Sequence, residues 1–235
     1  MYAAPVAEAS VDARVSYLRK VGLWTFAGLS VATITSIASA AFFLFVAPFL
    51  LGGLASTAVI LGCWFAAHMG CRSLVFSGST ATKVTGFFGG MVFQGIALGQ
   101  LVLFAVLMSV DLYANPLALV FQALALVGAT AFGMMGWLMT GPKNLSRVGA
   151  ILGTLSIPML IAMAISFAFP INGALGILIS VGFVAFSGLA LLYQLEQVIH
   201  QMSTEQHIEG AFTISMGLLI LFWNVLVLLM KLQRR

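Results

Sequence analysis

Seven long apolar stretches are the feature that most limits how this chain can fold. A helix of about 20 mostly apolar residues is long enough to cross the hydrocarbon core of a bilayer. The stretches cover residues 21–46, 49–69, 86–110, 117–140, 148–169, 174–195 and 211–230. They predict an all-α membrane protein with seven transmembrane helices.

The composition excludes an ordinary soluble fold. Of the 235 residues, 62% are hydrophobic and only 7% are charged, whereas a soluble domain carries about 25% charged residues. A core built from a chain of this length cannot hide that much apolar surface from water. We therefore expect the lipid bilayer to be the main partner of the protein surface.

Turn-forming residues separate the stretches, with no long linker between them. Helices end easily at proline and glycine, and Asn144 or Ser146 is suited to cap the fifth helix. The other breaks fall at Pro48, Asn115-Pro116, Gly141-Pro142 and Pro170 to Gly173. The sequence predicts a tail of residues 1–20 followed by one seven-helix domain of residues 21–235.

Lysine and arginine alternate between the two sides of the predicted helices. The tail and the loops after the second and fourth helices contain Arg14, Arg19, Lys20, Arg72, Lys83, Lys143 and Arg147, and the loops after the first, third and fifth contain none. Because cytoplasmic loops are rich in basic residues, this alternation places the N-terminus in the cytoplasm. The net charge of +4 thus reflects topology, and no nucleic-acid partner is expected.

The end of the chain departs from this alternation. Seven crossings put the basic C-terminus outside, and the loop after the sixth helix has acids and histidines instead: Glu196, His200, Glu205, His207 and Glu209. Either the last helix crosses and the basic tail follows it, or the last stretch is re-entrant. We favour a full crossing, because an uninterrupted helix satisfies its own backbone hydrogen bonds in lipid.

Ionisable groups are scarce at membrane depth. A charge at the bilayer centre costs at least ~2.5–3.5 kcal/mol, and no acid, lysine or arginine lies in the middle of a predicted helix; His68 lies near the end of the second. His200 and His207, in a loop that we expect to be solvated, are at most weak metal ligands. The sequence has no nucleophile–base or metal motif, so neither an enzyme nor a cofactor is expected.

The polar groups inside the helices are mostly amides, and glycines recur at a spacing of four. Gln94, Gln100, Gln122, Gln194 and Asn224 are the amides. They either bond helix to helix or line a polar cavity. The glycine pairs are Gly86 and Gly90, Gly95 and Gly99, and Gly149 and Gly153. Such pairs predict close helix–helix packing.

Three segments resemble the transmembrane Bax inhibitor motif family. The loop Thr140-Gly-Pro-Lys-Asn-Leu-Ser-Arg-Val-Gly149 is similar to the hallmark loop of that family. Residues 117–132 resemble its fourth helix, and Phe186-Ser-Gly-Leu-Ala-Leu-Leu-Tyr193 resembles the end of its sixth. The resemblance extends over residues 17–231 and implies seven helices with the last one central. The short termini are typical of a bacterial member in the inner membrane.

The resemblance also implies a pH-sensitive calcium leak that is controlled by two aspartates on the sixth and seventh helices. Here those positions match Gln194 and Gly217. Two close carboxylates share a proton and offer oxygen ligands to calcium, which an amide and a glycine cannot do. Glu196 lies about 200° around the helix from Gln194 and is a poor substitute. We therefore do not expect the calcium and pH switch in this chain.

Two functions remain in competition. The first is a regulator or interaction partner in membrane protein homeostasis or stress survival, with a membrane protease or another membrane protein as its partner. Its specificity would lie in the loop of residues 196–210 or on lipid-facing glycines. The alternative is an ion leak channel, with calcium as the candidate ion and with altered or lost pH gating. Such a channel needs one wet cavity, for which Gln194, His68, Gln94 and Gln122 are the candidate lining.

Overall fold

In the computed structural model, the chain is built almost entirely from helices. The structure describes residues 5–45, 54–113, 115–141, 144–168 and 173–233. The helices are α1 (Val11–Phe45), α2 (Leu54–Val75), α3 (Thr80–Tyr113), α4 (Ala118–Met139), α5 (Ser146–Ala168), α6 (Gly173–Glu196) and α7 (His207–Gln233). A 3-10 turn, η1 (Val6–Glu8), precedes α1, and a π-helical turn, η3 (Gln197–Gln201), follows α6. No strand occurs in these ranges, so the predicted all-α class is confirmed.

The described helix ends coincide with the predicted turn signals. The Leu117 backbone N–H donates to Asn115 Oδ1 over 3.1 Å just before α4 begins. Gly141 follows α4 with a φ of 131°, a conformation that glycine adopts without a steric penalty. The Ser146 N–H donates to Asn144 Oδ1 over 3.3 Å at the start of α5. The expected breaks at Pro48 and Pro170 lie outside the described residues.

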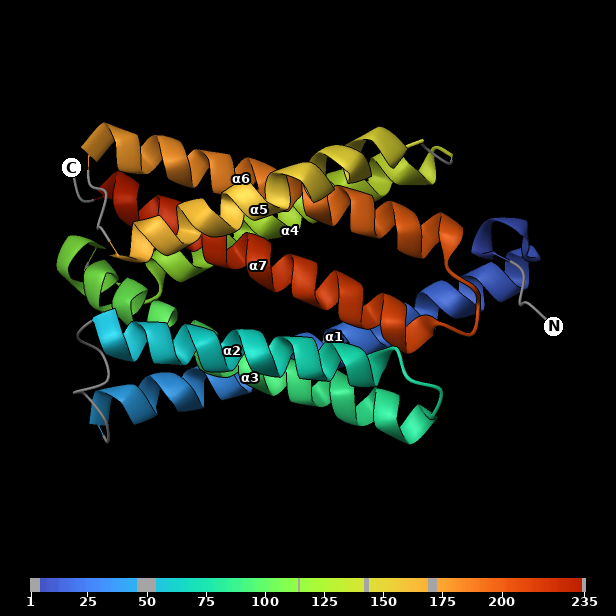
Figure 1. The fold of residues 1–235 in the computed structure, drawn as a ribbon, viewed down its shortest axis with the longest axis horizontal. Coiled ribbons are helices and arrows are strands. Elements are labelled where there is room, and N and C mark those ends of the chain that lie inside the picture. The colour runs from blue at the N-terminus through green and yellow to red at the C-terminus, as the bar shows by residue number, and fades with distance from the viewer. Residues whose placement is uncertain (1–4, 46–53, 114, 142–143, 169–172, 234–235) are drawn as a thin grey trace.

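Consecutive helices run in opposite directions along a single bundle (Figure 1). Helices α1, α2 and α3 form one group, α4, α5 and α6 form another, and α7 lies between the groups and packs against α1, α3, α4 and α6. The helices α1, α3, α5 and α7 begin at the end of the bundle where the described chain starts, and α2, α4 and α6 end there. We call this the N-terminal end of the bundle.

Five helices are long and apolar enough to cross a membrane: α1, α3, α4, α6 with its π turn, and α7. In the most apolar segment of each helix, the share of residues buried inside the bundle is 56% for α7, 28% for α1 and 17% for α4. Most of the surface of α1 and α4 therefore faces outward, where only lipid or another protein can cover it. The helices α2 and α5 also form as predicted but are not among the five.

Glycines bring α1 and α3 into close contact, as the sequence predicts. A Cβ atom at Gly95 would lie 2.5 Å from the Ala32 carbonyl oxygen, and one at Gly99 would lie 2.7 Å from Ser39 Cβ. The Ser39 hydroxyl donates to the Ile96 carbonyl oxygen over 2.9 Å. Only the missing side chains allow the two backbones to approach this closely.

The other predicted glycine contacts are confirmed with one exception. A Cβ atom at Gly86 would meet α2, at Gly90 it would meet Phe212 of α7, and at Gly149 it would meet the Tyr193 ring of α6. No atom of the described residues lies within 4 Å of a Cβ atom built at Gly153. Among these residues, only Gly149 of the pair makes a close helix contact.

The first residues are packed against the bundle. Helix α1 begins at Val11, ten residues before the predicted crossing, and Tyr17 is only 1% exposed. The Val6 N–H donates to the Met202 carbonyl oxygen over 2.8 Å, beside an isolated bridge between Pro5 and Ser203. The segment before α1 thus lies over the connection between α6 and α7. Its location in the cytoplasm stays a prediction.

The prediction of a solvated loop after α6 is wrong for three of its ionisable residues, although Gln201 and Glu205 are exposed. Glu196, His200 and Glu209 are only 4%, 7% and 3% exposed. The reason is that α6 continues through η3 and α7 begins at His207, so little chain is left as a loop. The segment before α1 covers part of what remains.

Candidate functional site

Gln194 and Gly217 lie directly against each other, where α6 packs on α7. A Cβ atom built at Gly217 would collide with the Gln194 Oε1 atom and would lie 2.9 Å from Leu191 Cδ1. The Gln194 Oε1 atom is buried and has no hydrogen-bond partner among the described residues. The structure therefore brings together the two positions that sequence reasoning paired, and it joins them through a neutral contact.

Glu196 does not take part in this contact. Its carboxylate oxygen Oε2 accepts a hydrogen bond of 2.7 Å from Gln201 Nε2, within the turn that follows α6. The side chain is nearly fully buried. The carboxylate is thus held at the end of α6, away from Gly217, as the helix geometry predicted.

His68 and Gln94 belong to a second cluster, which joins α2, α3 and α7. Trp64 Nε1 donates to Gln94 Oε1 over 2.7 Å, and Gln94 is only 2% exposed. The His68 ring stacks between Trp64 and Phe212, at centroid distances of 5.8 and 6.3 Å. The His68 Nδ1 atom is buried without a hydrogen-bond partner in the part of the chain described. Gln94 thus bonds one helix to another, which is the packing role weighed for the amides.

The two clusters meet different sides of α7. Phe212 and Gly217 are five residues apart, which is a rotation of about 140° around a helix.

Gln122 lies exposed on α4 and joins neither cluster. A surface depression of about 300 Å³ lies along α2, lined by Met69, Arg72, Ser73 and Phe76. None of the candidate site residues predicted from the sequence lines this depression; these are Gln194, Gly217, Glu196, His68, Gln94 and Gln122.

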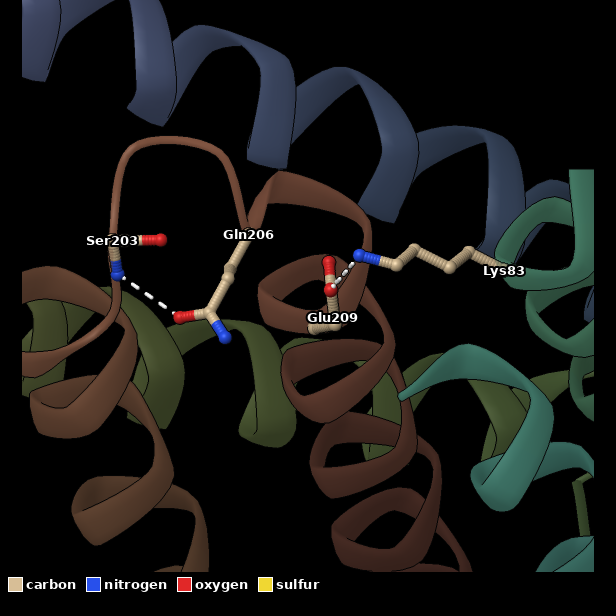
Figure 2. A network of polar contacts seen from close by, with 4 residues as sticks. All are labelled: Lys83, Ser203, Gln206 and Glu209. Atoms are coloured by element: carbon tan, nitrogen blue, oxygen red, sulfur yellow. Dashed lines mark hydrogen bonds and ion pairs between the residues drawn. The ribbon is translucent and has the colours of Figure 1, made fainter. Parts of the chain in front are cut away.

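Sequence reasoning missed an ion pair at the N-terminal end of the bundle. Figure 2 shows Lys83 of α3 reaching Glu209 of α7, with 2.5 Å between Nζ and Oε1. The Glu209 side chain is 4% exposed and the Lys83 side chain 22%. The sequence did contain one signal for this ion pair. Glu209 lies next to the last apolar stretch, and a carboxylate buried there needs a cation nearby. The sequence does not say which of the ten lysines and arginines supplies it.

Other buried polar atoms lie at the same end of the bundle as this ion pair. The Tyr17 hydroxyl, the His207 Nδ1 atom and the second carboxylate oxygen of Glu209 have no hydrogen-bond partner among the described residues. The Ser203 N–H donates to Gln206 Oε1 over 3.0 Å in the turn that leads into α7 (Figure 2). Within the described ranges, no group of three or more His, Cys, Asp and Glu side chains is arranged to hold a metal ion.

The family described as inhibitor of apoptosis-promoting Bax1 matches residues 14–234, nearly the whole chain. The chain belongs to this family. No curated protein matches it at a significant level. The match agrees with the helical bundle and with its five apolar, membrane-length helices. This member of the Bax inhibitor-1-like family is therefore an integral, multi-pass membrane protein.

Proposed function

We propose that this family member conducts no ions, catalyses no reaction, and regulates another membrane protein by binding to it. In this proposal it acts in membrane protein homeostasis or stress survival, with a membrane protease as one candidate partner. It lies in the inner membrane of a bacterium. All seven helices cross, α7 is the central helix, and the N-terminus faces the cytoplasm. The observation that carries the proposal is the neutral contact between Gln194 and Gly217.

This contact leaves no titratable group at the α6–α7 interface where the family resemblance implies an aspartate pair. Paired carboxylates respond to pH because they cannot both be charged at close range, and their oxygens suit calcium. Gln194 offers one neutral oxygen, which occupies the space where a side chain at position 217 would begin. The site thus offers neither a proton switch nor a calcium ligand set.

The alternative, a leak channel with altered gating, has one observation in its favour. Gln194 Oε1 and His68 Nδ1 are both buried without hydrogen-bond partners among the described residues, as polar atoms in a wet path would be. A single path would have to pass from one side of α7 to the other, since the two clusters lie about 140° apart around that helix. We therefore keep the channel as the second candidate.

Calcium efflux from sealed proteoliposomes at pH 6 and pH 8 separates the two candidates. The key variant is Gln194→Asp with Gly217→Asp, in which the shorter Asp at 194 withdraws from Gly217. The matched control is Gln194→Asn with Gly217→Asn, which has the same shape without charge. We expect efflux no faster than from empty liposomes for the native protein and the Asn pair. For the Asp pair, we expect efflux that depends on pH.

Calcium efflux by the native protein at either pH would refute the proposal and establish the channel. If the native protein and the Asp pair are both silent, the non-conducting function stands. In that case positions 194 and 217 are not sufficient to restore an ion switch.

The outer face of α4 is the surface that best suits a partner in the membrane. Glu196, His200 and Glu209 of residues 196–210 are buried, whereas Gln201 and Glu205 are exposed. We place the specificity on the lipid-facing glycines. None of the described residues has an atom within 4 Å of Cβ atoms built at Gly133 and Gly136, and Phe132 beside them is 79% exposed. A photo-crosslinking residue at Phe132 should capture a membrane protein in cells. The same residue at Phe26 of α1, which is 74% exposed, serves as the control.

A further inference from the structure

The Lys83–Glu209 ion pair joins two helices that are far apart in the sequence. Lys83 lies in the first turn of α3 and Glu209 in the first turn of α7. Their contact of 2.5 Å is the one ion pair in the part of the chain that the structure describes (Figure 2). The proposed function makes no use of it, so its presence at this interface needs its own explanation.

Stability alone is a weak explanation. Removing both charges from water costs free energy that the attraction between them often only just offsets, and apolar pairs of similar size often stabilise a protein as well. Buried ion pairs are best attested as devices that fix one arrangement of the elements they join. We therefore interpret the ion pair as a contact that fixes the position of α3 relative to α7.

The neighbouring contacts between α3 and α7 are apolar and lack direction. A Cβ atom at Gly90 would lie 2.7 Å from the Phe212 ring and 3.0 Å from Met216 Cε. Spacings of three and four residues put Glu209, Phe212 and Met216 on one face of α7. An apolar face against a glycine can separate or slide without leaving a hydrogen bond unmade. The ion pair is thus the directional contact at this end of the interface.

The Tyr17 hydroxyl of α1 lies close to the start of α7, since a Cβ atom at Gly210, the residue after Glu209, would be 2.9 Å from it. The Glu209 Oε2 atom and the Tyr17 hydroxyl are both buried and lack hydrogen-bond partners among the described residues. The Glu209 charge acts on Tyr17 and on His207, and His207 is also under the influence of Lys20 and Lys83. When α3 moves away, the Tyr17 hydroxyl is the group from α1 that we expect to donate a hydrogen bond to Glu209, although it does not neutralise the charge. Two discrete arrangements of this kind are what a switching element requires.

We propose that the Lys83–Glu209 ion pair is a latch that holds α3 against α7, and that its release opens the α3–α7 interface at the N-terminal end of the bundle. The latch concerns conformation only. It stands whether or not the protein conducts ions.

A cysteine at Met216 tests the latch in the full-length protein. Met216 is 4% exposed and faces Gly90, so a cysteine there reacts with a water-soluble thiol reagent only when the interface opens. Cys63 and Cys71 are free thiols and are first replaced by alanine. Labelling rates are compared for the native pair, Lys83→Gln, Glu209→Gln, both together, and the exchanged pair Lys83→Glu with Glu209→Lys. Size-exclusion chromatography confirms that each variant is folded.

We expect at least about tenfold faster labelling in the folded neutral variants and a return to the native rate in the exchanged pair. Equal rates in all folded variants would overturn the latch, even if their thermal stability falls. If every neutral variant fails to fold while the exchanged pair folds, the ion pair is needed for assembly. That outcome also overturns the proposal.

Discussion

At the residue scale, single polar contacts tie helices together where the apolar packing has no direction. The Trp64–Gln94 hydrogen bond joins α2 to α3, and the Lys231 ammonium of α7 donates to the Gly176 carbonyl oxygen of α6 over 3.2 Å. Lipid contacts resemble core contacts in polarity, so the hydrophobic effect does little to choose between helix faces. Such bonds therefore decide which face meets which.

Replacing Trp64 with phenylalanine tests this at one bond. A phenyl ring remains at position 64 to stack on His68, but the buried Gln94 oxygen loses its donor. We expect a loss of about 1–2 kcal/mol of stability, measured as a lower midpoint of thermal denaturation in detergent. In a Gln94→Leu background the same substitution should cost much less. An equal cost in both backgrounds would mean that the hydrogen bond is not the cause.

At the scale of elements, the same residue type has opposite roles on different helices. Glycine on α3 lets α1 approach to backbone contact, whereas a Cβ atom at Gly133 or Gly136, on the outer face of α4, would meet no atom of the described residues. The sequence motif is similar in both places. The difference lies in what stands opposite each glycine.

Alanine substitution separates these two roles. In Gly95→Ala, the new methyl group meets the Ala32 carbonyl oxygen, a backbone atom that cannot rotate away. Overpacking of this kind costs about 1–3 kcal/mol. In Gly133→Ala the methyl group meets no atom of the residues that the structure describes, and alanine favours a helix by up to about 1 kcal/mol. We expect thermal stability in detergent to fall for Gly95→Ala and to hold or rise for Gly133→Ala. A fall of similar size in both would contradict this assignment.

At the scale of the whole molecule, the direction of each helix sets the topology. The alternating directions in Figure 1 put the start of α1 and the end of α7 at opposite ends of the bundle. Seven crossings would therefore leave the two termini on opposite sides of the membrane. The basic residues at the C-terminus oppose that orientation, but the seven basic residues earlier in the chain favour it.

Reporter fusions test the orientation in a bacterial host. A green fluorescent protein at the N-terminus should fluoresce, since it folds in the cytoplasm. Alkaline phosphatase after Arg235 should be active, since it folds outside. An inactive phosphatase together with a fluorescent fusion at the same position would show that the last stretch is re-entrant.

The number of helices, their approximate limits and the membrane class were all predictable from the sequence. Each depends on local properties: the length of an apolar run, the residues that end it, and the scarcity of charge. The pairing of Gln194 with Gly217 came from the family resemblance, and the structure places the two in contact. Local pattern and resemblance were sufficient for these features because neither needs to know which helix faces meet.

Only the tertiary structure decided which faces meet. These helices are apolar on all sides, so periodicity does not identify an inner face. Two contacts join segments that are more than 100 residues apart. One is the ion pair between Lys83 and Glu209. In the other, residues 5–9 cover the connection from α6 to α7. The burial of Glu196 and His200 follows from the π turn and that cover. A charge that looks solvated in the sequence is buried here because distant segments of the chain enclose it, and short-range pattern carries no information about that enclosure.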